Sequence, residues 1–218
     1  MRTKTLIAAA AILAVSLATT VAQTNVYSQN VVGYINLNLT NTLTLIANQL
    51  AIDATGTNNT VLNTLASNVP VGTFVYAYDS GSFVSATFGT KGWSGITPAV
   101  NRAMNPGSGF FIRLPAGMAT NLTLVGEVRQ GVLQIPYIAG FNLLSSIVPQ
   151  GGRLQADLGY APVAGDLVYR FNPVTQSYVT YSYGTKGWSP SDPTLGVGES
   201  FWLKAVSAGT WTRNFTVQ

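Results

Sequence analysis

The chain has 218 residues, which is enough for one large domain or two small ones. It contains no His and no Cys, so catalysis by Ser-His-Asp or Cys-His groups, His-ligated zinc, disulfide bonds and lipid attachment to Cys are excluded. Charged residues make up only 8% of the chain. Beyond the first four positions there are nine basic and seven acidic residues, and this near balance excludes a nucleic-acid-binding surface.

The first 22 residues predict an export signal. Met1–Lys4 supplies a basic start, residues 6–18 are apolar or small, and Thr20–Ala22 places small residues where a signal peptidase reads them, so we expect cleavage before Gln23. A retained membrane anchor is the alternative, but this stretch is rich in Ala and Thr, whereas a spanning helix needs roughly 20 strongly apolar residues. We therefore expect a secreted or cell-surface protein whose contact with the membrane is made only by the cleaved signal.

An internal repeat organises the rest of the chain. Residues 88–93 read Phe-Gly-Thr-Lys-Gly-Trp, and residues 183–188 repeat this with Tyr in place of Phe. Three further pairs of segments match in the same order: 43–46 with 141–144, 73–76 with 166–169, and 109–113 with 200–204. Four collinear matches predict a duplication. We place copy 1 at residues 23–128 and copy 2 at residues 129–218, and with no long linker between them we expect the copies to pack together, for which pseudo-twofold symmetry is one arrangement.

Alternating side chains predict strands within the matched segments. Larger side chains share one face of each strand: Phe74, Tyr76 and Tyr78 in copy 1, and Leu167, Tyr169 and Phe171 in copy 2. The other face carries Thr73, Val75 and Ala77 in copy 1, and Asp166, Val168 and Arg170 in copy 2. We expect the first set to face the core. A turn at 79–81 or 172–176 then leads into a partner strand, 83–88 or 178–183, which predicts a β-hairpin in each copy.

One short helix is expected in each copy. Val61 and Leu65 stand four residues apart, as do Leu154 and Leu158. Asn58 or Asn59 could cap the first helix and Gly159 could end the second. Closing strands are expected at 122–128 and 211–217. The predicted fold class is therefore mostly β, with two tandem homologous antiparallel modules, each a β-sandwich or small barrel with one short helix.

No catalytic or metal-binding constellation stands out. The acidic residues beyond the signal are Asp53, Asp79, Glu127, Asp157, Asp166, Asp192 and Glu199. The repeat aligns none of them with an acid in the other copy, which excludes a carboxylate pair shared by both modules but leaves open one within a single module or between modules. Gly107-Ser108-Gly109 resembles a nucleophile turn, yet it precedes a predicted strand in a chain without His. We expect it to be a simple turn, and we expect no catalytic residue, metal or cofactor.

The repeated Gly-Thr-Lys-Gly-Trp segment has two interpretations. In the first it is a tight turn whose glycines adopt positive φ while the Trp covers the core. In the second Trp93 and Trp188 stack on a sugar ring and Lys91 and Lys186 donate hydrogen bonds beside them. Further aromatic residues accompany these turns in the alternating segments: Tyr76, Tyr169, Tyr181 and Tyr183. The ligand-binding candidates are therefore Lys91, Trp93, Lys186 and Trp188.

The residues 139–146, Ala-Gly-Phe-Asn-Leu-Leu-Ser-Ser, resemble the opening strand of a tandem β-rich repeat module found in uncharacterised exported bacterial and archaeal surface proteins. In that module a Val-Tyr or Val-Trp strand follows, and a Gly-x-Gly-Phe-Trp-Ile type strand comes later, which resembles residues 107–112 and 198–203. Copy 1 departs from the opening motif with Thr42–Thr44, and copy 2 has Ser200 at the second Gly. The resemblance implies accessory, surface-attached or binding domains and brings no catalytic residues.

The sequence thus predicts a non-enzymatic secreted or cell-surface protein that acts in adhesion or envelope structure. A carbohydrate-binding module pair that uses the Gly-Thr-Lys-Gly-Trp turns is the alternative, and a secreted hydrolase with a carboxylate pair is a third hypothesis. The expected partners are polysaccharides or other envelope and surface proteins, with no nucleic acid.

Overall fold

A computed structural model describes residues 31–53, 56, 58–102 and 104–217. The predicted signal at residues 1–22 lies outside the described residues. From Val31 onward the chain forms one compact unit, mostly antiparallel β, with two similar halves. Across the described residues, every helix is too short or too polar to span a membrane.

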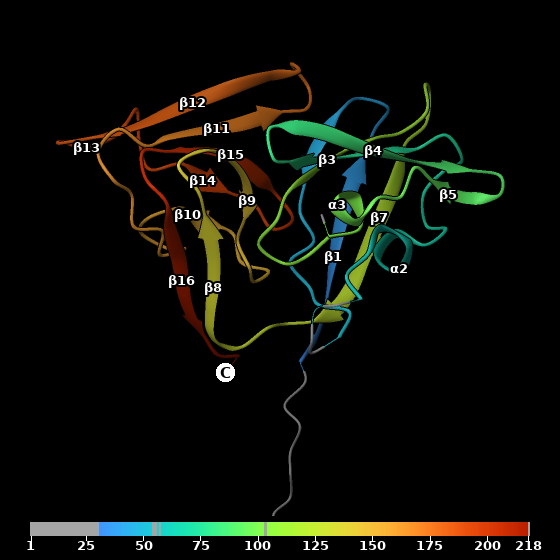
Figure 1. The fold of residues 1–218 in the computed structure, drawn as a ribbon, viewed down its shortest axis with the longest axis horizontal. Coiled ribbons are helices and arrows are strands. Elements are labelled where there is room, and N and C mark those ends of the chain that lie inside the picture. The colour runs from blue at the N-terminus through green and yellow to red at the C-terminus, as the bar shows by residue number, and fades with distance from the viewer. Residues whose placement is uncertain (1–30, 54–55, 57, 103, 218) are drawn as a thin grey trace, which may run out of the picture. The chain divides into compact units, whose positions relative to one another are not determined.

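The first half contains two sheets and two short helices (Figure 1). Its strands are β1 (Val32–Leu39), β2 (Thr44–Ile46), β3 (Phe74–Asp79), β4 (Ser82–Gly89), β5 (Gly92–Ser94), β6 (Phe110–Arg113) and β7 (Thr120–Glu127). Its helices are α2 (Val61–Leu65) and α3 (Pro98–Arg102). One sheet has the order β2-β6-β3-β4-β5, and β1 pairs with β7 in the other.

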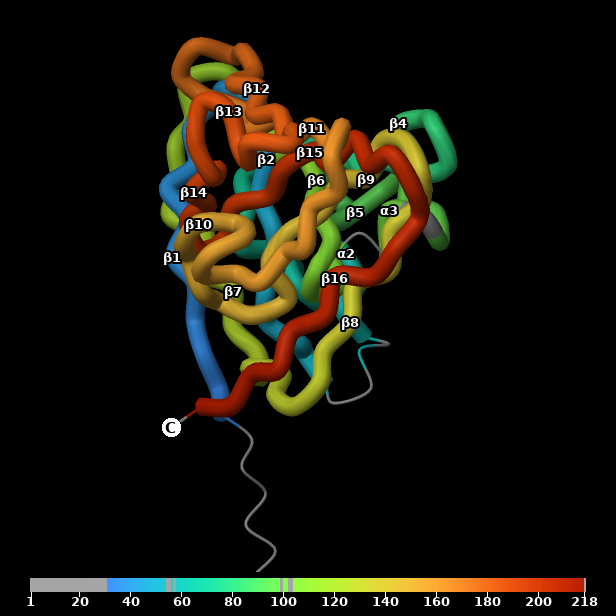
Figure 2. The backbone as a smooth tube through the Cα atoms, turned by 90° about the vertical axis from the view of Figure 1, so that its left-hand side faces the viewer, coloured from blue at the N-terminus to red at the C-terminus, as the bar shows by residue number. Residues whose placement is uncertain are grey.

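The second half repeats this order. Its strands are β8 (Gly131–Tyr137), β9 (Gly140–Ser145), β10 (Gly152–Arg153), β11 (Leu167–Asn172), β12 (Ser177–Gly184), β13 (Gly187–Ser189), β14 (Thr194–Leu195), β15 (Ser200–Ala205) and β16 (Gly209–Phe215). The five-stranded sheet has the order β13-β12-β11-β15-β9, β8 pairs with β16, and a small sheet joins β10 to β14. Figure 2 shows β8 and β16 running side by side.

The strand registers agree with the repeat found in the sequence. Ile46 on β2 pairs with Phe110 on β6, and Leu144 on β9 pairs with Phe201 on β15. The two pairs are equivalent, because the repeat aligns Ile46 with Leu144 and Phe110 with Phe201. The two predicted hairpins also form, as β3–β4 and β11–β12.

The core of each half lies between its large sheet and its strand pair. In the first half Leu122 and Leu124 of β7 pack in the same cluster as Val75 and Phe110. In the second half Trp211 of β16 packs with Val168, Phe201 and other apolar residues. Burial of this apolar surface is the main stabilising contribution available to a chain without disulfides.

The prediction of which strand face enters this core was wrong. Val75 and Ala77 are 0% and 3% exposed and belong to the core of the first half, whereas Tyr76 and Tyr78 join a separate cluster between the halves. Copy 2 repeats the arrangement, because Val168 lies in its core and Tyr169 and Phe171 join the shared cluster. The physical reason is space: large residues from other strands already fill each core, so β3 and β11 contribute small side chains there.

The helix prediction holds only for copy 1. Helix α2 spans Val61–Leu65, but its cap is Thr60, whose Oγ1 accepts a hydrogen bond from the Asn63 N–H (3.1 Å), and not Asn58 or Asn59. Residues 154–158 form a turn with no α-helix, although Leu154 and Leu158 are buried as expected. Pairing of β10 with β14 keeps the chain extended up to Arg153. The N–H groups of Asp157 and Leu158 then both donate to the Arg153 carbonyl oxygen (3.0 and 2.9 Å), so the chain makes a turn without the regular hydrogen-bond ladder of a helix.

A second helix in the first half was not expected. Helix α3 begins at Pro98, directly after Thr97, whose Oγ1 accepts a hydrogen bond from the Val100 N–H (3.2 Å). Thr followed by Pro is a typical helix start, because the hydroxyl caps a free N–H and Pro needs no partner for its own nitrogen. This signal was present in the sequence.

Candidate binding groove between the two halves

The two halves contact each other through reciprocal backbone hydrogen bonds. The Ala47 N–H donates to the Gly198 carbonyl oxygen (2.8 Å), and the Ser145 N–H donates to the Gly107 carbonyl oxygen (3.0 Å). These are equivalent positions in the repeat, since 47 corresponds to 145 and 198 to 107. Figure 2 shows β2, β6, β9 and β15, the strands beside these bonds, close together. The expectation that the copies pack together is confirmed, and the contact is pseudo-twofold.

Aromatic side chains extend the same symmetry. The rings of Phe111 and Phe171 meet edge to face with centroids 5.4 Å apart, and those of Tyr78 and Trp202 meet in the same way at 4.7 Å. Phe111 occupies the position equivalent to Trp202, and Phe171 the position equivalent to Tyr78. Each such pair contributes roughly 0.5–1.5 kcal/mol beyond the area that it buries. The aromatic faces of β3 and β11 therefore hold the halves together.

Not all of these rings are covered. A cavity of about 400 Å³ opens between the halves and is lined by Tyr78, Phe83, Phe141, Tyr169, Tyr178 and Trp202. Phe83 is 52% exposed, and Phe141 and Tyr178 are each 46% exposed. Isolated exposed apolar residues are common, but several exposed rings gathered over one cavity are not, and this makes the cavity a candidate binding site.

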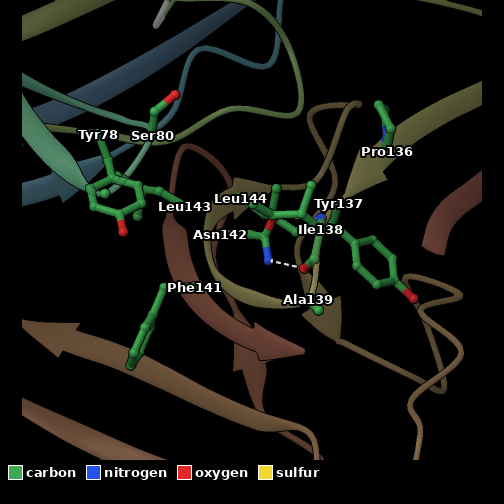
Figure 3. Close-up of a pocket in the computed structure, with 11 residues that line it drawn as sticks. Tyr78, Ser80, Pro136, Tyr137, Ile138, Ala139, Phe141, Asn142, Leu143 and Leu144 are labelled. Atoms are coloured by element: carbon green, nitrogen blue, oxygen red, sulfur yellow. Dashed lines mark hydrogen bonds between the residues drawn. The ribbon is translucent and has the colours of Figure 1, made fainter. Parts of the chain in front are cut away.

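Two neighbouring cavities continue this one. The first shares Phe83 and Tyr178 with it and reaches Arg113 and Gln176. The second shares Tyr78 and Phe141 and reaches the hairpin tip at Ser80 (Figure 3). We call the three together the aromatic groove. It runs along the junction of the two halves and is open to solvent.

Polar side chains at the groove fix its walls. The Asn142 Nδ2 donates to the Ile138 carbonyl oxygen (2.7 Å), and the Asn142 Oδ1 accepts from the Ile138 N–H (2.9 Å), which ties down the turn before β9 (Figure 3). The Gln176 Nε2 donates to the Leu43 carbonyl oxygen (2.8 Å) across the junction. The longer hairpin tip of copy 2 thus contacts copy 1.

The four ligand-binding candidates predicted from the sequence lie elsewhere. Lys91 lies in the β4–β5 turn and Lys186 in the β12–β13 turn, and Trp93 and Trp188 lie on the strands that follow, β5 and β13. Figure 1 shows β5 and β13 at opposite sides of the view, so the structure does not bring the two turns together. Both lysines are exposed.

Both tryptophan rings are half-buried against the core of their own half. The Trp93 Nε1 donates to the Ala66 carbonyl oxygen (2.8 Å), and its ring lies 5.2 Å from that of Phe88. The Trp188 ring lies 5.2 Å from that of Tyr183, and its Nε1 is buried without a hydrogen-bond partner among the described residues. The packing agrees with the first interpretation of the repeated turn, and the binding role stays a prediction.

Several carboxylates hold the chain in shape. Asp166 is buried and accepts hydrogen bonds from the Tyr160 hydroxyl (2.8 Å) and from the N–H groups of Val163 and Val206 (both 2.9 Å). Burial, together with the Asp166 carboxylate, raises the pKa of Tyr160 well above its usual value. That phenol therefore stays protonated and keeps donating to Asp166.

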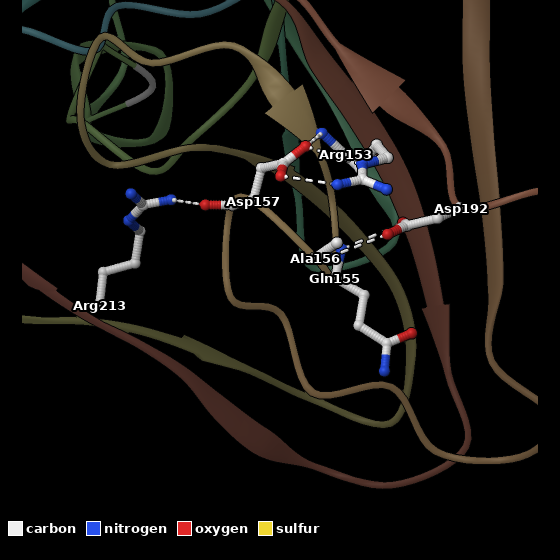
Figure 4. Close-up of polar contacts among 6 residues, drawn as sticks. All are labelled: Arg153, Gln155, Ala156, Asp157, Asp192 and Arg213. Atoms are coloured by element: carbon white, nitrogen blue, oxygen red, sulfur yellow. Dashed lines mark hydrogen bonds and ion pairs between the residues drawn. The ribbon is translucent and has the colours of Figure 1, made fainter.

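A second group of carboxylates fixes the turn at residues 153–158 (Figure 4). The Arg153 Nε donates to Asp157 Oδ2 (2.9 Å), and this bond lowers the pKa of Asp157 to about 2. Asp192 accepts the N–H groups of Gln155 (3.0 Å) and Ala156 (2.9 Å), as a capping residue does at a helix start. Within the described part of the chain, three or more potential metal-ligating acids never gather at one point.

Comparison with known proteins gave no match to a family model, to a curated protein sequence or to a solved structure.

Sequence reasoning missed the residues that form the groove. Phe83 and Tyr178 occupy equivalent positions, as do Phe111 and Trp202, so the repeat had paired them. An aromatic residue kept at the same place in both copies but directly after a hairpin turn, where a polar residue would suffice, was the available signal. What the sequence did not contain was the docking of the halves, which brings these pairs to one groove.

Proposed function

We propose that this chain is a non-enzymatic exported protein that acts at the cell surface in adhesion or in envelope structure, and that it binds its partner through the aromatic groove. The groove carries the proposal, because Phe83, Phe141 and Tyr178 expose about half of their surface over one cavity. Clefts between domains, lined by aromatic rings with a few polar groups, are common ligand sites. Export rests on the signal at residues 1–22.

We also infer that each half is a small β-sandwich and that the two arose by duplication. The shared strand order and the reciprocal hydrogen bonds at Ala47 and Ser145 support this inference. A duplicated module that docks on its own copy gains a composite surface that neither copy has alone. The groove is such a surface, since Tyr78 comes from copy 1 and Trp202 from copy 2.

Carbohydrate binding remains the alternative function, but we place the binding site in the aromatic groove and not at the Gly-Thr-Lys-Gly-Trp turns. The turns with Lys91 and Lys186 lie apart, and the rings of Trp93 and Trp188 pack on the core. Aromatic rings are the usual platform for the C–H faces of sugars, and the groove offers more of them in one place than either turn. The structural use of Asp157, Asp166, Asp192 and Glu199 supports a binding role over a hydrolytic one.

The mature chain tests this proposal directly. Purified protein is mixed with the insoluble envelope fraction of the cells that produce it, and the bound fraction is measured against protein concentration. We expect saturable binding, with no release of reducing ends or of other soluble products from the envelope. Binding that never saturates, or steady release of products, would contradict the proposal.

A further inference from the structure

The aromatic groove contains two equivalent subsites. Each combines a Tyr, a second aromatic ring and a basic residue, and the two share the rings of Phe83 and Tyr178. The equivalent groups that line the groove are Tyr76 and Phe111 on one side, and Tyr169 and Trp202 on the other. Arg113 lines the first subsite, and its equivalent Lys204 lies beside the second, with its Nζ 5.6 Å from the centroid of the Phe141 ring. Repeated subsites along one open groove suit a ligand that is itself made of repeating units, and a polysaccharide is such a ligand.

The floor of the groove is suited to sugar rings. Tyr178 is 46% exposed, and the Trp202 Nε1 donates to its hydroxyl (3.3 Å), which fixes the position of the phenol. Burial raises the pKa of Tyr178, so its hydroxyl stays protonated and free to donate to a ligand oxygen. A tyrosine held in this way offers both a stacking face and a hydrogen-bond donor.

Two positively charged side chains, Arg113 and Lys204, lie at the groove and favour a negatively charged ligand. The guanidinium carbon of Arg113 lies 5.0 Å from the centroid of the Phe74 ring, and the Lys204 Nζ lies 5.6 Å from that of the Phe141 ring. Both basic side chains are exposed, and neither forms a salt bridge with another described residue. The residues that line the three cavities of the groove include no Asp and no Glu. An aromatic floor with an unpaired cation on either side complements a ligand with apolar ring faces and negative charge.

We infer that the aromatic groove binds an anionic polysaccharide of the uronate type, whose ring faces stack on Phe83, Phe141 and Tyr178 and whose carboxylates pair with Arg113 and Lys204. This inference rests on the proposed function and names the class of ligand for the same groove. Surface carboxylate pairs are weak individually, so the two cations act together with the aromatic stacking.

The charge part of the inference is tested with one ligand in two forms. Oligogalacturonate and its fully methyl-esterified form differ in charge but share the sugar backbone. Titration calorimetry with the mature protein should show binding of the acid form at least about tenfold tighter than binding of the ester, and this preference should shrink as salt rises from about 50 mM to about 500 mM. Equal affinity for the two forms would overturn the inference.

The location is tested with matched charge variants. R113Q/K204Q removes the two cations beside the groove, and K91Q/K186Q removes two lysines that are also exposed but lie at the repeated turns. We expect the first variant to weaken oligogalacturonate binding about tenfold and the second to change it less than about twofold. Equal losses would place the binding elsewhere, and a larger loss in K91Q/K186Q would favour the turns.

The aromatic part is tested with side chains that are about half exposed. Phe83→Ala and Tyr178→Ala truncate half-exposed rings, and Tyr34→Ala truncates a ring on β1 that is 72% exposed and does not line the groove. We expect losses of about tenfold for the first two and none for the third. Circular dichroism verifies that all three remain folded.

Failure of this inference differs from failure of the proposed function. If the groove variants bind the envelope fraction as tightly as the unchanged chain does, the groove assignment falls while surface binding stands. If the unchanged chain shows no saturable envelope binding, the proposed function falls, whatever its affinity for oligogalacturonate. Tighter binding of neutral glycans than of oligogalacturonate would overturn the choice of an anionic ligand alone.

Discussion

Gly109 packs directly against Ser200 where the two halves of the protein meet. The two residues are equivalent positions of the repeat. A Cβ on Gly109 would lie 2.6 Å from both the Cβ and the Oγ of Ser200, so there is room for only one side chain at this point. The Ser200 Oγ uses that room to donate to the Ile46 carbonyl oxygen (2.9 Å). The contact therefore permits a side chain at this position in one copy but not in both.

A first prediction follows for Gly109→Ala. The backbone of Gly109 is not in the left-handed region, so the cost of the change is steric. We expect a loss of about 1–3 kcal/mol in the free energy of unfolding, the usual range for overpacking. Urea denaturation of the purified chain measures this loss.

The double variant G109A/S200G is the control. Removing the Ser200 side chain frees the space that the new methyl group needs, so the double variant should lose less than the sum of the two single changes. Strict additivity of the two losses would show that the residues do not compete for space.

Much of this fold can be predicted from the sequence, because it depends on local signals. The identical Gly-Thr-Lys-Gly-Trp turns mark the same hairpin end in both copies, and the residues that the repeat aligns, Ile46 with Leu144, pair with equivalent partners in the two halves. Alternation, however, is symmetric between the two faces of a strand. It shows that Val75 and Tyr76 point in opposite directions, but not which of them enters the core of its own half.

The missing information is long-range. Large side chains from β6 and β7 fill most of the core, so only the small side chain of Val75 fits there. Tyr76 points the other way and is covered because the two halves dock on each other. The helix predicted at residues 154–158 does not form for the same reason. The chain before it is held extended by the long-range pairing of β10 with β14, which an apolar i, i+4 pattern does not reveal. The groove depends on both effects and could not be read from either copy alone.

The second prediction compares two equivalent tryptophans. Trp93→Phe removes an N–H that donates to the Ala66 carbonyl oxygen (2.8 Å). Trp188→Phe removes a buried N–H that has no hydrogen-bond partner among the described residues. Both changes replace the same half-buried ring by the same smaller one, and only the first breaks a hydrogen bond, so Trp93→Phe should destabilise the chain by about 1 kcal/mol more.

Urea denaturation of the two variants provides the comparison. The Ala66 residue strengthens the expectation, because its φ of 44° ends helix α2 in an unfavourable conformation that the bond from Trp93 helps to hold. If Trp188→Phe turns out to be the more costly change, the Trp93 hydrogen bond has no net value.

The third prediction concerns two ion pairs of different exposure. The Arg170 Nε and Nη2 donate to the two carboxylate oxygens of Glu199 (2.8 and 2.9 Å), and these side chains are 31% and 23% exposed. The side chains of Arg153 and Asp157 are 57% and 43% exposed. Water screens the second pair more strongly, so its coupling should be smaller.

A double-mutant cycle for each pair measures the coupling. With R170Q, E199Q and their combination we expect a coupling free energy of about 1 kcal/mol, in the range for a part-buried charged hydrogen bond. The cycle with R153Q and D157N is the matched control. A control coupling as large as that of the Arg170–Glu199 pair would contradict the role given to burial.

The last prediction is the pH dependence caused by Asp157. Its pKa falls from 3.8 to about 2 in the folded chain, chiefly because of the hydrogen bond from Arg153. A carboxyl group with a lowered folded pKa stabilises the chain above its unfolded pKa and loses this contribution as pH falls through the folded value. D157N should therefore melt at a lower temperature than the unchanged chain at pH 7, and the difference should shrink between about pH 4 and pH 2. Thermal unfolding across this range, repeated in an R153Q background, shows whether Arg153 is the cause. Without the arginine the pKa of Asp157 returns toward its usual range. The difference in melting temperature caused by D157N should then be smaller at pH 7 and nearly constant below pH 4. A difference that keeps its full size at pH 2 in the presence of Arg153 would show that Asp157 acts through contacts other than its charge.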